Sequence, residues 1–134
     1  MSTVIRNEVS KKNHYYIPKH RMLELKHFCL QYDDWKKERS KITVIQSYQI
    51  GKIPGGGNSD KVSNLAMRAA ELDGYAELVV RCCKEADDYI WKWLFEGVTS
   101  GVSYGALQAR GIPCGKDYYY DRYRKFFWLL DKVR

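Results

Sequence analysis

The residues best suited to chemistry lie near the C-terminal end, where basic, aromatic and acidic side chains alternate. A turn of about 100° per residue along a helix gathers several of them on or beside one face. Guanidinium, ammonium and phenol groups in such an arrangement can hydrogen-bond base edges and phosphates. We predict DNA contacts at seven residues: Lys116, Tyr118, Asp121, Arg122 and Lys125 in the groove, and Arg110 and Arg124 at phosphates.

Two of these assignments leave alternatives open. Asp121 can pair with a neighbouring arginine or accept a hydrogen bond from a cytosine amino group. Tyr118 and the two tyrosines after it can equally serve as packing residues, with the charges forming a solvated face.

The charge balance favours a polyanionic partner. The 134 residues carry 23 Lys and Arg against 16 Asp and Glu, a formal net charge of +7. From Ser103 to Arg134 seven basic residues face three acidic ones, so +4 of this charge lies on the last 32 residues. A protein that neutralises phosphates gains free energy from the counterions it releases.

The predicted site needs two helices to position it. Ser103 suits the N-cap of a short helix that runs to Arg110, and Gly111–Gly115 forms a turn. A second helix follows from Lys116 to about Lys132, with Asp117 in its first turn. Helix, short glycine-containing turn and helix is the layout of a helix-turn-helix, whose second helix enters the major groove.

The preceding residues predict two longer helices. The first runs from Pro18 to about Tyr48, and a glycine-rich loop at Gly51–Gly57 ends the pattern. The second begins near Asn58 and ends near Glu96, with Gly97 as its C-terminal cap. Its apolar residues follow a three- and four-residue spacing typical of a helix-pairing seam: Val62, Leu65, Ala69, Leu72, Ala76, Val79, Cys83, Ala86, Ile90 and Trp93.

Together these elements predict an all-α fold. We expect a long antiparallel helical hairpin over residues 1–97 that serves as a scaffold, followed by the helix-turn-helix over residues 98–134. A dimeric coiled coil is the variant of the hairpin, so a homodimer is a candidate assembly.

Other classes of function find little support. The four cysteines lack the spacing of a zinc site or a disulfide framework, which favours reduced thiols. His14, His20 and His27 make no metal-ligand set, and the acidic pairs Asp33-Asp34 and Asp87-Asp88 are expected to be solvated. The sequence shows neither a signal peptide nor a membrane span. We therefore expect a cytoplasmic protein that is not an enzyme and needs no metal or cofactor.

Two segments resemble a known family. Gly55-Gly56-Gly57-Asn58-Ser59-Asp60-Lys61-Val62 is similar to a G-G-G-x-S-D-K-V segment of small phage and prophage regulators of Gram-positive bacteria. Ser103-Tyr104, Ile112-Pro113 and the run Tyr119–Phe127 resemble the C-terminal domain of the same group, the late transcription activators of the RinA and ArpU kind.

The resemblance implies a domain similar to region four of sigma factors. It further implies binding to double-stranded phage promoter DNA and activation of transcription, with host RNA polymerase as a candidate partner. Members of the group often carry an acidic residue and a hydroxyl where this chain has Tyr104-Gly105-Ala106.

Two alternatives belong to other classes. A small terminase-like packaging component also joins a helix-turn-helix to a helical oligomerisation arm, and would assemble as a ring. A phage protein that binds and inhibits a host protein would show no salt-dependent DNA binding.

Overall fold

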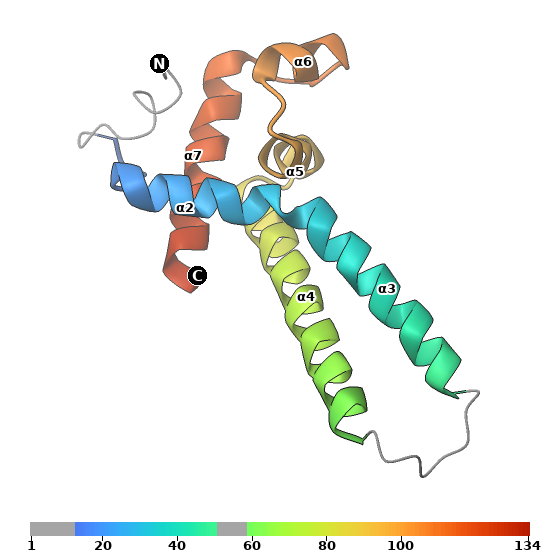
Figure 1. The fold of residues 1–134 in the computed structure, drawn as a ribbon. Helices are drawn as coiled ribbons and strands as arrows, with labels where there is room; N and C mark the ends of the chain where they lie inside the picture. Colours follow the sequence, from blue (N-terminus) through green and yellow to red (C-terminus); the bar gives the residue numbers. More distant parts are fainter. Residues whose placement is uncertain (1–12, 51–58) are drawn as a thin grey trace. The chain divides into compact units, whose positions relative to one another are not determined.

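The computed structural model describes residues 13–50 and 59–134 and confirms the all-α class (Figure 1). The glycine-rich loop, and with it half of the first segment that carries the family resemblance, lies outside the described residues. The described helices are α2 (Lys19–Leu30), α3 (Tyr32–Ile50), α4 (Ser59–Ala86), α5 (Trp91–Ser100), α6 (Tyr104–Ala109) and α7 (Lys116–Val133).

The helices group into two compact units that differ from the expected division at residue 97. Unit 1 comprises the described residues up to Gln31 together with Leu78–Arg134, and unit 2 comprises Tyr32–Glu77. Helix α4 runs through both units. The grouping differs from the expectation because α2 packs with α5 and α7 rather than serving only as an arm of the hairpin.

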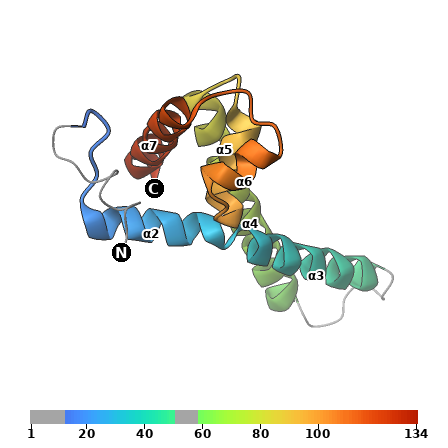
Figure 2. The same ribbon diagram turned by 90° about the horizontal axis from the view of Figure 1, so that it is seen from above.

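Unit 1 holds most of the buried apolar side chains. Its helices α2, α5, α6 and α7 can be followed from a second direction in Figure 2. Helix α2 packs on α5 and α7, and α5 packs on α6. Arg21 of α2 reaches α7, where its Nε donates to the Asp131 carboxylate over 2.7 Å. The largest fully buried side chains of the unit are Tyr119, Phe126, Phe127, Ile17, Met22, Leu25, Ile90, Leu94, Leu107 and Leu130.

In unit 2, α3 and the first part of α4 run in opposite directions (Figure 1). Trp35 packs against Tyr75 in a tilted arrangement, with ring centroids 5.3 Å apart. Glu38 accepts two hydrogen bonds from Arg68, and Asp73 accepts one from Arg39 over 3.0 Å. Within the seam predicted for this part of α4, Ala69 and Leu72 are buried, whereas Val62 is exposed.

Both long helices predicted from the sequence are interrupted. The first ends at Leu30, where Gln31 is the C-cap: its backbone N–H donates to the Phe28 carbonyl over 3.2 Å, and its side-chain amide donates to the His27 carbonyl over 3.1 Å. The second ends at Ala86, and residues 87–90 form a corner before α5 begins. Ile90 and Trp93 therefore lie beyond the seam helix, although Ile90 is still fully buried.

Gly97 is not the helix cap that its sequence context predicts. It lies inside α5 and is buried, and the helix ends with Gly101, which adopts the left-handed conformation at φ 72°. A left-handed glycine is a common helix terminator because it has no Cβ to clash.

No helix in the part of the chain that the structure describes combines the length and the apolar character required to cross a bilayer.

Candidate nucleic-acid interface

The α6–α7 segment forms as its local sequence predicts. Ser103 caps α6, its Oγ accepting from the Ala106 N–H over 3.3 Å. The connecting turn uses Gly111 at φ 97°, and the Ile112 N–H donates back to the Leu107 carbonyl over 3.1 Å. The Tyr104 hydroxyl then donates to the Cys114 carbonyl over 2.6 Å. These bonds fix the approach of the chain to the first residue of α7.

Helix α7 has one buried face, as the helical phase predicts. Tyr119, Phe126, Phe127 and Leu130 are almost completely buried, while Tyr123 is half-buried. Their rings pack mainly edge to face, for example Phe126 on Phe127 with centroids 4.8 Å apart. Because this face anchors the helix in unit 1, the residues between these positions are left nearer the surface.

The N-terminal end of α7 is open to solvent. Lys116 and Asp117 are exposed, and the N-cap residue Gly115 has no side chain with which to cap the helix. A surface hollow of about 560 Å³ lies beside this end, lined by Ser103, Tyr104, Gly105, Gln108, Gly115, Lys116 and Tyr120. Uncapped N–H groups at a helix start, next to a lysine, are a favourable environment for a phosphate group.

Arg122 is engaged within the protein rather than extended into solvent. Its Nε donates to the Asp121 carboxylate over 3.0 Å, and a terminal nitrogen donates to the Ala86 carbonyl over 3.4 Å. The guanidinium also lies over the Tyr118 ring, 5.6 Å from its centroid. Only 22% of the Arg122 side chain is exposed. Of the two alternatives for Asp121, the structure contains the pairing with arginine.

The remaining predicted contacts differ in accessibility. Arg110 is half exposed and pairs with Glu96 over 3.2 Å. Arg124 is 17% exposed and lies 4.0 Å from Asp121; its buried Nε has no hydrogen-bond partner among the described residues. Lys125 is half-buried. The structure thus brings Tyr118, Asp121 and Arg122 together and leaves Lys116 and Arg110 as the accessible cations of the predicted set.

Asp87 is a site residue that the sequence analysis assigned to solvent. Instead it is 9% exposed, and its Oδ1 accepts from the N–H groups of Tyr89 and Ile90 over 2.8 and 2.9 Å. Its Oδ2 accepts a short hydrogen bond from the Tyr118 hydroxyl. Asp87 therefore couples the corner between α4 and α5 to the proposed recognition helix. The sequence did contain a signal for this role, because Asp87 lies shortly before the start of α5 and aspartate is a common helix-capping residue.

This environment moves the pKa of two groups. Burial alone would raise the pKa of Asp87, but the hydrogen bonds from Tyr118, Ile90 and Tyr89, together with the nearby charge of Arg122, lower it below its ordinary value. The hydrogen bond to Asp87 raises the pKa of Tyr118, and burial adds to that rise.

Potential metal ligands do not cluster in the part of the chain that the structure describes. Among the described residues, no three His, Cys, Asp or Glu side chains lie close enough to hold a metal ion. All four cysteines are free thiols, three of them buried, and burial raises the pKa of Cys29, Cys82 and Cys83.

Comparison of the chain with protein families, curated proteins and solved structures finds no match. Its function is therefore inferred from the geometry of unit 1.

Proposed function

We propose that this protein is a DNA-binding transcription regulator that places α7 in the major groove. The observation that carries the proposal is the α6–turn–α7 arrangement, in which a short capped helix precedes a longer helix with an open, lysine-bearing N-terminus. Helix-turn-helix proteins present the first residues of the second helix to base edges. The positive surplus on the last 32 residues supports the same conclusion.

The structure changes the roles we assign within this interface. Lys116 and the first N–H groups of α7 are the proposed phosphate contacts near the hollow, and Arg110 is a second one. Tyr118 presents an exposed ring, suited to apolar contact with a base or sugar, while its hydroxyl is held by Asp87. Arg122 acts mainly within the protein: its contacts with the Tyr118 ring and the Asp121 carboxylate hold these two side chains in place for DNA binding.

We extend the proposal to the genes that are regulated: the protein activates transcription of phage or prophage genes. It rests on the family resemblance of the Ser103–Phe127 region, as does host RNA polymerase as a further partner.

Fluorescence anisotropy tests DNA binding directly. Labelled duplexes from the genomic neighbourhood of the coding sequence are titrated with the full chain over a salt series. Tight binding to one duplex and weak, salt-sensitive binding to the others is the expected result. Absence of binding at low salt overturns the proposal and leaves a protein partner as the better hypothesis.

A matched pair of variants locates the interface. Lys116→Ala and Lys37→Ala each remove one exposed lysine charge, the first from α7 and the second from α3. If Lys116 contacts a phosphate, its loss reduces the slope of log K against log salt by about 0.9. Lys37→Ala is expected to leave the slope unchanged, and equal effects of the two variants would contradict the assignment.

A further inference from the structure

Two lysines beside the corner between α4 and α5 are not part of the interface assigned to α7. Lys84 lies in the last turn of α4 and Lys92 in the first turn of α5, and both ammonium groups lie over the indole of Trp91. The distances to the ring centroid are 4.8 Å for Lys84 and 5.9 Å for Lys92. Both lysines are exposed, and Trp91 is half-buried. We call these three residues the corner patch.

The positive charge of the corner patch is not neutralised within the described parts of the chain. Neither Lys84 nor Lys92 forms an ion pair with a carboxylate of residues 13–50 or 59–134. The neighbouring Glu85 and Asp88 are exposed, and the oxygens of Asp87 accept hydrogen bonds from other residues. Because both ammonium groups stand over one ring, two like charges are held close together, and an anion beside them relieves their repulsion.

Asp87 places the corner patch next to the start of α7. Its Oδ1 accepts from the Tyr89 N–H, and its Oδ2 accepts from the hydroxyl of Tyr118 in the first turn of α7. Trp91 follows Asp87 by four residues, so their Cα atoms lie within about 14 Å of each other. The major groove is about 12 Å wide and is bordered by phosphates on both sides. Phosphates beside the groove that α7 enters are therefore within reach of the corner patch.

Exposed tyrosines lie on both sides of the Asp87 carboxylate. Tyr118 is 46% exposed and Tyr89 is 72% exposed, although the backbone of Tyr89 is fixed by its hydrogen bond to Asp87. Tyrosine hydroxyls donate to phosphate oxygens in protein–DNA interfaces, as lysines and arginines do. The surface between the start of α7 and the corner patch thus continues the combination of aromatic and basic groups that suits a duplex backbone.

We propose that the corner patch binds the DNA backbone beside the groove that α7 enters. Lys84 and Lys92 each neutralise one phosphate, and Trp91 is a positioning residue that holds both ammonium groups. This inference rests on the proposed function and extends its contact surface from α6 and α7 to the junction of α4 and α5. Backbone contacts carry no sequence information, but they fix the orientation of the recognition helix on the duplex.

A pair of double variants of the full chain tests this assignment by fluorescence anisotropy over a salt series. Lys84→Gln/Lys92→Gln should reduce the slope of log K against log salt by about 1.8, which corresponds to two phosphate contacts. It should weaken binding to the target and to unrelated duplexes by the same factor. The control is Lys36→Gln/Lys37→Gln, because these exposed lysines lie on α3 and Lys36 stands 5.7 Å from the Tyr32 ring centroid. The control should leave the slope unchanged.

Photocrosslinking locates the contact independently of charge. Tyr89→p-benzoylphenylalanine should crosslink to a bound duplex, whereas the same replacement at Tyr48 of α3, which is 69% exposed, should not. If the wild type binds DNA but Lys84→Gln/Lys92→Gln keeps its slope, or only the Tyr48 variant crosslinks, the inference is wrong and the proposed function stands. If the wild type binds no duplex at low salt, the proposed function is wrong and the inference is overturned with it.

Discussion

At the scale of single residues, Asp87 connects two parts of unit 1 that are far apart in sequence, the corner after α4 and the start of α7. One carboxylate oxygen holds the N–H groups of Tyr89 and Ile90, and the other holds Tyr118, which lies 31 residues further along the chain. Because Asp87 is almost completely buried, its charge is stabilised by these bonds rather than by water.

The first prediction concerns removal of this carboxylate. Asp87→Ala should lower the free energy of unfolding by about 1–2 kcal/mol, since the corner loses its cap and Tyr118 loses its partner. Asp88→Ala is the matched control, because the adjacent side chain is exposed, and it should change stability by less than about 0.5 kcal/mol. Urea denaturation followed by circular dichroism measures both. Equal losses in the two variants would show that the bonds of Asp87 contribute nothing particular.

The second prediction is the pH dependence of the same residue. The pKa of Asp87 is lowered on folding, so the unfolded state binds the proton more readily. Its contribution is therefore complete above the unfolded pKa of about 3.9 and is lost as the pH falls toward the lower folded value.

Wild type and Asp87→Asn should accordingly differ most in unfolding free energy near neutral pH, and the difference should shrink below about pH 4. Asp88→Asn serves as the reference for exposed charge. A gap between wild type and Asp87→Asn that stays constant from neutral to acid pH would argue against ionisation as its source.

At the scale of elements, the packing of α5 on α7 depends on a glycine. A methyl group at Gly97 would overlap the Tyr119 hydroxyl and lie 3.3 Å from Cζ of the same ring. The close approach explains why this position inside a helix lacks a side chain, despite the cost of glycine in helices.

The third prediction follows from that contact. Gly97→Ala should destabilise the protein by about 1–3 kcal/mol, as overpacked sites do, and Tyr119→Phe in the same chain should restore part of the loss. Gly74→Ala is the control within α4, where an added Cβ meets nothing within 4 Å. That change should stabilise by about 0.5–1 kcal/mol. Thermal unfolding measures the stability of the variants. If both alanine substitutions stabilise the protein, the Tyr119 side chain moves away from an added methyl group at little cost, and the prediction is wrong.

The same elements show what the sequence could predict. The bounds of α6 and α7, the Ser103 cap and the buried face of α7 follow from local periodicity and capping chemistry, and all are present. Asp87 and Gly97 were misassigned because their partners lie 31 and 22 residues away. A regular spacing through Ile90 and Trp93 concealed the corner after Ala86, since helical phase can continue across a break.

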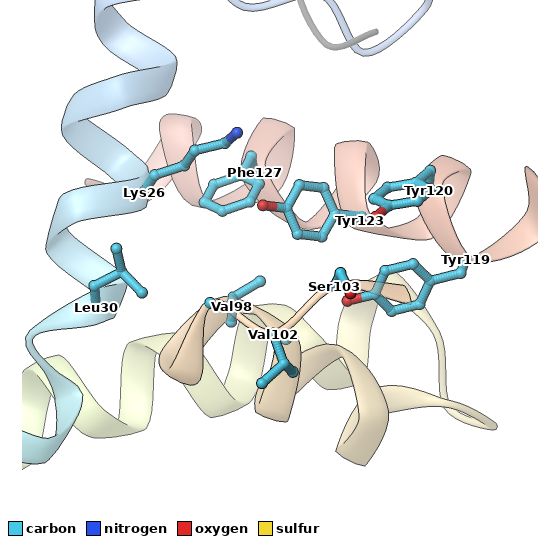
Figure 3. A pocket seen from close by; sticks show the side chains of 11 residues that line it. Lys26, Leu30, Val98, Val102, Ser103, Tyr119, Tyr120, Tyr123 and Phe127 are labelled. Carbon is cyan, nitrogen blue, oxygen red and sulfur yellow. The ribbon is translucent and has the colours of Figure 1, made fainter. Parts of the chain in front are cut away.

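The sequence also could not predict which site residues are exposed to solvent. The helical phase predicted that Arg122 lies at the edge of a solvent-exposed face. In the structure its guanidinium instead donates hydrogen bonds to Asp121 and to the Ala86 carbonyl. A cavity of about 260 Å³ in unit 1 is lined by residues of α2, α5 and α7 (Figure 3). Because no single segment of the sequence contains this lining, the cavity could not be predicted from the sequence.

At the scale of the whole molecule, apolar burial is distributed unevenly. Among the described residues of unit 2, the buried apolar side chains are Trp35, Ile42, Ala69 and Leu72, whereas unit 1 has a much longer set. Unit 2 relies in addition on ion pairs such as Arg39 with Asp73, whose side chains are 34% and 56% exposed. Exposed pairs of this kind contribute little to stability and are screened by salt.

Hydrogen exchange followed by mass spectrometry should therefore reveal two levels of protection. Amides of α3 should exchange faster than those of α2, α5 and α7, because opening unit 2 exposes less apolar surface than opening unit 1. Raising the salt concentration should accelerate exchange in α3, since its ion pairs with α4 are partly exposed and are screened by salt. Trp35→Ala should deepen the contrast by removing the largest buried side chain of unit 2, while peptides from α7 keep their protection. Equal protection of α3 and α7 in the wild type would instead mean that the two units open together, with α4 transmitting the stability of unit 1 to its neighbour.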